Sequence, residues 1–99
     1  MQSIQKYVDL IDEELCGAKN YAEAYVEWKA KKDSYWSQRF KECALDELKH
    51  AEYIHDLTVQ EITRLKEVFT PPTEMQEKWD KSHKKYVEKA SWVKQMLSM

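Results

Sequence analysis

Residues that let a chain reverse its direction are almost absent from this sequence. It has one glycine and two prolines in 99 residues, and the two prolines are adjacent, at Pro71 and Pro72. Tight β-hairpins and phosphate-binding loops both need glycine, so the sequence argues against a β-rich fold and against a glycine-rich nucleotide-binding loop. Because Glu, Lys, Ala, Gln and Leu are frequent and favour helices, we predict an all-α fold.

Three helices are expected, separated by a turn and by the proline pair. The first runs roughly over residues 3–32, the second opens after Asp33-Ser34 and runs to about residue 69, and the third covers about 74–96. Ser3 is a candidate cap for the first helix, and Asp33 and Ser34 are good capping residues for the second. Pro71 ends the second helix, because the residue before a proline is disfavoured in the helical conformation. The first two helices are long and joined by a tight turn, so we expect them to run antiparallel.

We therefore predict a single domain with two parts. Residues 1–70 form a long antiparallel helical hairpin, and residues 71–99 form a Pro-Pro hinge and a C-terminal amphipathic helix. Sixteen basic and eighteen acidic residues give a net charge of −2, which does not favour nucleic acid as a partner. The sequence has neither an apolar run of about 18 residues nor the apolar core of a secretion signal, so we expect a cytoplasmic protein without membrane contacts.

Ionisable residues interrupt the apolar stripe of each long helix. At about 100° per residue, Glu14 lies in the middle of the first stripe, Glu47 lies at the centre of the second, and His50 lies at its side. An unpaired charge in a helical core loses its hydration, so these residues need partners. A turn near residues 31–33 brings all three to the same height in an antiparallel hairpin, and we predict that they cluster.

This cluster has the composition of a metal site. Glu47 and His50 are one helical turn apart, so both can reach a single ion, and carboxylates with an imidazole suit iron, manganese or zinc. We predict that Glu14, Glu47 and His50 are metal ligands. A second Glu-x-x-His pair, Glu52 and His55, has Glu52 about 140° from Glu47 on the solvated side, and we interpret it as a surface coincidence.

Residues 10–58 resemble the ferritin-like superfamily of di-iron carboxylate proteins, especially its rubrerythrin and encapsulated-ferritin branches. Residues 14–21 are similar to the family's first-helix pattern Glu-x-x-Ala-x-x-x-Tyr, with Gly17 where alanine is usual. Residues 47–51 match its second-helix pattern Glu-x-x-His-Ala. The resemblance implies a four-helix bundle, built around two such half-sites.

By this resemblance Glu14 is the first-helix ligand, Glu47 a bridging carboxylate and His50 the nitrogen ligand. Tyr21 would be a hydrogen-bond partner of these ligands. The third helix has Asp80 and His83 in place of a second Glu-x-x-His, so two chains are expected to build the site. The resemblance thus implies a homodimer, or a higher homo-oligomer, with two iron ions per dimer, manganese and zinc being alternatives. The implied activity is ferroxidase-type iron oxidation or the handling of peroxide.

A second function class fits the same residues. In a metal-free helical interaction or scaffold protein, Glu14, Glu47 and His50 would form a buried polar network that fixes helix register and pairing. The sequence leaves open whether the protein is an enzyme or a module of this kind.

Overall fold

The chain forms three helices and the connections between them. A computed structural model describes residues 2–99, with α1 over Gln2–Ala30, α2 over Ser34–Val68 and α3 over Thr73–Leu97. The described residues contain no strand, which confirms the all-α prediction. Within residues 2–99, no helix has both the length and the apolar character needed to cross a membrane.

The turn between α1 and α2 is short because two local features stop one helix and start the next. Lys32 has a φ of 60°, a left-handed conformation that ends the helical path. The side chain of Asp33 then accepts a hydrogen bond from the backbone N–H of Trp36 at 3.0 Å, which caps α2 as the sequence predicts. The expected cap of α1 is wrong: the helix already includes Gln2, so Ser3 lies inside it.

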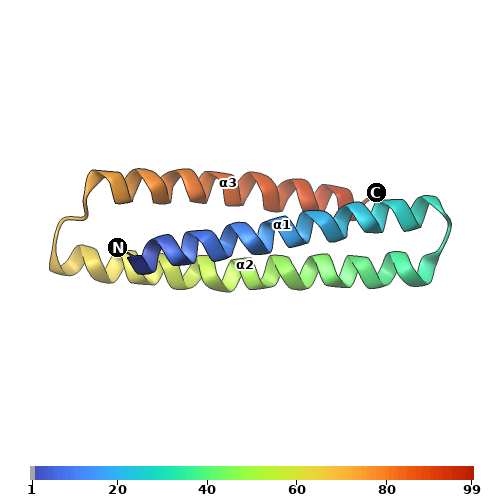
Figure 1. Ribbon diagram of the computed structural model, residues 1–99, viewed down its shortest axis with the longest axis horizontal. Helices are drawn as coiled ribbons and strands as arrows, with labels where there is room; N and C mark the ends of the chain where they lie inside the picture. Colours follow the sequence, from blue (N-terminus) through green and yellow to red (C-terminus); the bar gives the residue numbers. More distant parts are fainter. Residues whose placement is uncertain (1) are drawn as a thin grey trace.

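The three helices lie side by side in a rod of 55 × 17 × 17 Å. α1 and α2 run antiparallel, and α3 returns along the hairpin in the same direction as α1 (Figure 1). α3 packs more extensively on α1 than on α2. Its polar links to α1 include an ion pair between Lys85 and Asp12 at 3.4 Å and a hydrogen bond from Lys29 to the backbone oxygen of Met99.

The apolar core lies between all three helices. Small side chains such as Ala18 and Ala44 are fully buried and let α1 and α2 approach closely. The larger core residues come from each helix: Ile11 and Leu15 of α1, Leu48 and Ile62 of α2, and Met75, Trp79, Val93 and Leu97 of α3. On α1 this core occupies one edge of the apolar stripe, about 20–100° from Glu14.

The other edge of each stripe is not covered by α3. Here the side chains are half-buried or exposed: Tyr21, Trp36 and Leu57 are 36%, 47% and 40% exposed. We call this surface the open face of the hairpin. It consists of Leu10, Glu14, Gly17 and Tyr21 of α1, and of Trp36, Phe40, Cys43, Glu47, His50, Ile54 and Leu57 of α2.

Candidate metal centre

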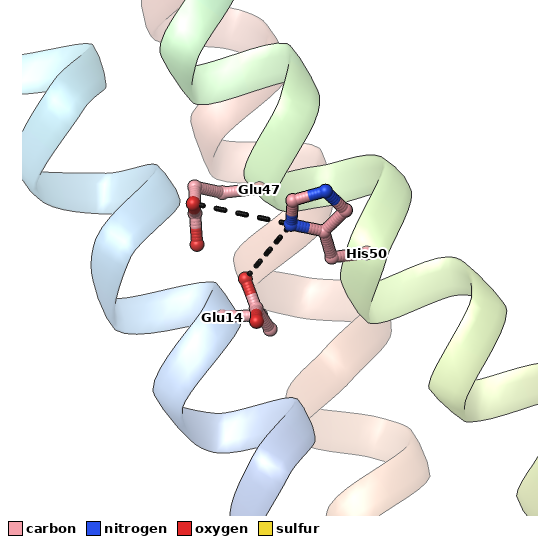
Figure 2. Close-up of side chains that lie close together, drawn as sticks. All are labelled: Glu14, Glu47 and His50. Atoms are coloured by element: carbon pink, nitrogen blue, oxygen red, sulfur yellow. Dashed lines mark hydrogen bonds and ion pairs between the residues drawn. The ribbon is translucent and has the colours of Figure 1, made fainter.

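The structure brings together the three residues that the sequence predicts to cluster. Glu14 extends from α1, Glu47 and His50 extend from α2, and α3 passes behind both helices in this view (Figure 2). Nδ1 of His50 lies 3.4 Å from Oε2 of Glu14 and 4.0 Å from Oε1 of Glu47. One ligand atom from each residue lies within 4.8 Å of the other two, so the three groups surround a common point.

Gly17 makes room for one of these carboxylates. A Cβ atom at this position would lie 2.9 Å from Oε2 of Glu47, closer than the ordinary contact distance of about 3.5 Å. The sequence marked Gly17 only as a departure from the family pattern. Its spatial role is visible only once α2 is packed on α1.

The charges of the cluster perturb Glu47. Its pKa is raised above the ordinary value of 4.5, first because its side chain shares a hydrogen bond with Glu14. Burial and the negative charges of Glu14 and Asp46 raise the pKa further, and the charge of His50 opposes them. Two carboxylates this close favour sharing a proton when no cation lies between them.

The three side chains are less buried than their central position in the apolar stripes suggests. The exposed fractions of the side chains are 25% for Glu14, 26% for Glu47 and 53% for His50. A single chain leaves the stripes partly open, because α3 covers only one edge of the hairpin and leaves the cluster on the open face.

Tyr21 lies on the same face but interacts elsewhere. Its ring stacks on that of Phe40, with ring centroids 6.3 Å apart and an interplanar angle of 29°. Over the described part of the chain, its hydroxyl forms no hydrogen bond with Glu14, Glu47 or His50. Its role as a hydrogen-bond partner of the ligands stays a prediction.

The second Glu-x-x-His pair is not simply a surface feature. Glu52 is exposed as expected, but the side chain of His55 is only 12% exposed. Nε2 of His55 lies 2.8 Å from Nδ1 of His83 on α3. The interpretation of His55 as a surface residue is wrong because it lies about 80° from Glu47, on the edge of α2 that faces α3.

The donor atoms of the open-face cluster fit a divalent transition-metal ion. Carboxylate oxygen and imidazole nitrogen are the donors that iron, manganese and zinc accept in proteins. The two carboxylates balance the charge of one dication. Neighbouring negative charges are among the causes that raise the pKa of Glu47, and a bound cation would offset them. Three side chains leave coordination positions open for further ligands.

The comparisons with known proteins found no family model, no curated protein and no solved structure that matches this chain. The ferritin-like resemblance therefore depends on the patterns at residues 14–21 and 47–51 alone.

Proposed function

We propose that the protein binds iron through Glu14, Glu47 and His50, and that a homodimer combines two such clusters into a di-iron centre. The observation that carries this proposal is the convergence of two carboxylates and one imidazole, from two helices, within 4.8 Å. Residues 14 and 47 are far apart in the sequence, so their meeting depends on the fold and is not a local coincidence.

Each side chain has a distinct task in this proposal. Glu47 would supply one carboxylate, and because its pKa is raised, a cation competes there with a proton that is held more strongly than on an ordinary glutamate. Glu14 supplies the second negative charge, and His50 supplies a nitrogen that already faces Glu14. Bound iron would supply the oxidation of ferrous to ferric ion, with dioxygen or peroxide as the electron acceptor.

A second copy of the chain is the natural source of the missing ligands. It would bring its own Glu14, Glu47 and His50 to the same centre, as two-fold symmetry requires. The same contact would cover Trp36 and Leu57, which are large apolar side chains exposed on the open face. Two hairpins packed in this way make a four-helix bundle.

The test compares two neighbouring substitutions on α1. Glu14→Ala removes a proposed ligand, whereas Glu13→Ala removes an exposed carboxylate one residue away. Under anaerobic conditions, we expect Glu14→Ala to lose ferrous iron binding and the iron-dependent absorbance change on adding oxygen. Glu13→Ala should behave like the wild type, and equal loss in both variants would contradict the proposed site.

The metal-free interaction module is the second candidate, and one observation favours it. The three side chains already lie against one another, because Nδ1 of His50 is 3.4 Å from Oε2 of Glu14 and 4.0 Å from Oε1 of Glu47. In that case the cluster would be a polar network that fixes the register of the paired helices. A wild type whose thermal stability does not respond to iron would favour this function.

A further inference from the structure

A second pair of metal-binding side chains lies between α2 and α3, outside the open face. His55 of α2 and His83 of α3 point toward each other, with Nε2 of His55 2.8 Å from Nδ1 of His83. Their ring centroids are 5.0 Å apart and their planes are inclined by 35°. His55 is five residues after His50, so about 140° of helix rotation separates the two, and they serve different helix contacts.

The surroundings hold one ring firmly and leave the other accessible. His55 stacks on Tyr86 at a centroid distance of 4.4 Å and lies 5.2 Å from the ring of Trp79. Its side chain is 12% exposed, whereas His83 is exposed to solvent. An ion can therefore approach from the side of His83 and meet a fixed second ligand.

We propose that His55 and His83 form a two-histidine site for a borderline dication such as Zn²⁺, which fastens α3 to α2. Imidazole nitrogen is a preferred ligand of zinc, and two nitrogens bound to one zinc ion at the tetrahedral angle lie about 3.4 Å apart. The facing nitrogens need to separate by about 0.6 Å to reach this distance, and the exposed ring of His83 can make that movement. Solvent completes the coordination.

The hydrogen that lies between the two histidine rings can move to another nitrogen when a metal ion binds. Oδ1 of Asp56 lies 3.8 Å from Nδ1 of His55 and favours the tautomer with hydrogen on Nδ1. Nε2 of His55 then accepts a hydrogen bond from the Nδ1–H of His83. When zinc binds, His83 transfers this hydrogen through solvent to its own Nε2, so both facing nitrogens offer lone pairs and no net proton is released.

Metal binding at His55 and His83 would affect how firmly α3 is attached to α2. α3 makes few contacts with α2, and it follows a connection that contains Pro71 and Pro72. A metal bridge between His55 and His83 would add a fixed link at this weakly packed boundary. The proposal does not depend on the iron site, because none of its ligands belongs to the open face.

Zinc titration followed by NMR of the histidine rings tests this proposal. The chain has three histidines, so the ring signals of His55 and His83 can be followed beside those of His50. We expect added Zn²⁺ to shift the signals of His55 and His83 together and to raise the unfolding temperature. Changes at His50 report separately on the open-face cluster, so either site can fail alone.

His83→Asn is the matched variant, because the amide nitrogen of asparagine takes the place of Nδ1–H and can still donate to His55. In chelator it should retain most of the wild-type stability. We expect its His55 signals to lose their response to zinc, and its unfolding temperature to rise less with zinc than that of the wild type. A zinc response at His55 that is the same in His83→Asn, or none at either ring in the wild type, would overturn the proposal.

Discussion

Replacing Gly17 by alanine should have two different effects, one on the stability of α1 and one on the position of the Glu47 carboxylate, a proposed metal ligand. The new Cβ atom would lie 2.9 Å from Oε2 and 3.4 Å from Cδ of Glu47. The carboxylate must retreat by about 0.6 Å to restore an ordinary contact of about 3.5 Å. Since it is the far end of a flexible side chain, this movement has a small cost for folding but changes where its oxygens lie.

The expected effects on stability and on metal binding have opposite signs. A glycine inside a helix is less favourable than alanine by about 1 kcal/mol, so Gly17→Ala should make the metal-free protein more stable. For a domain of this size, about 1 kcal/mol raises the unfolding temperature by about 4–8 °C. The displaced carboxylate of Glu47 should at the same time weaken iron binding, so iron should stabilise the variant less than the wild type.

Thermal unfolding in chelator and in anaerobic ferrous iron measures both effects. Asn20→Ala is the control, because Asn20 is an exposed residue of α1 and its replacement also improves helix propensity, by about 0.5 kcal/mol. It should be stabilised in chelator and respond to iron like the wild type. A Gly17→Ala protein that is destabilised in chelator, or that gains as much from iron as the wild type, would refute this reasoning.

Three further predictions follow from the same geometry. In chelator, Glu47→Gln should be as stable as the wild type or more stable. The difference in stability should grow as pH rises above 4.5, because the raised pKa of Glu47 in the folded state makes its ionisation destabilising. Glu47→Gln should also lose the stabilisation by iron, whereas Glu52→Gln should keep it. Burial and His83 lower the pKa of His55 below 6.5, so the free energy of unfolding in chelator should fall as pH drops from 6.5 through the lowered pKa. Urea unfolding measures this fall, and His55→Gln should make it smaller. Light scattering should give a mass of about 24 kDa, twice the 11.9 kDa of the chain, and a mass near 12 kDa with and without iron would contradict the homodimer.

Much of the hairpin could be predicted because its causes are local. The capping side chain of Asp33 and the lack of other breaks define where α2 begins. Helical periodicity and antiparallel direction then place Glu14 beside Glu47 and His50, without any knowledge of packing. The clustering of these residues follows from this geometry alone.

The placement of α3 could not be predicted in the same way. An amphipathic stripe shows which side of a helix is buried but not which partner covers it, and the hairpin offers two edges to α3. The structure places α3 against the edge of Leu15 and Leu48, which leaves the Glu14 cluster on the open face. The contact between His55 and His83 depends on this choice, so sequence reasoning missed it.

An anaerobic titration of the chelator-treated wild type with ferrous iron tests the central claim most directly. If Glu14, Glu47 and His50 bind iron as proposed, binding should saturate at about one iron per chain, which is two per dimer. Admission of oxygen should then oxidise the bound iron. Saturation at a ratio near one that Glu14→Ala abolishes is the predicted result, and a wild type that binds no ferrous iron would contradict the account.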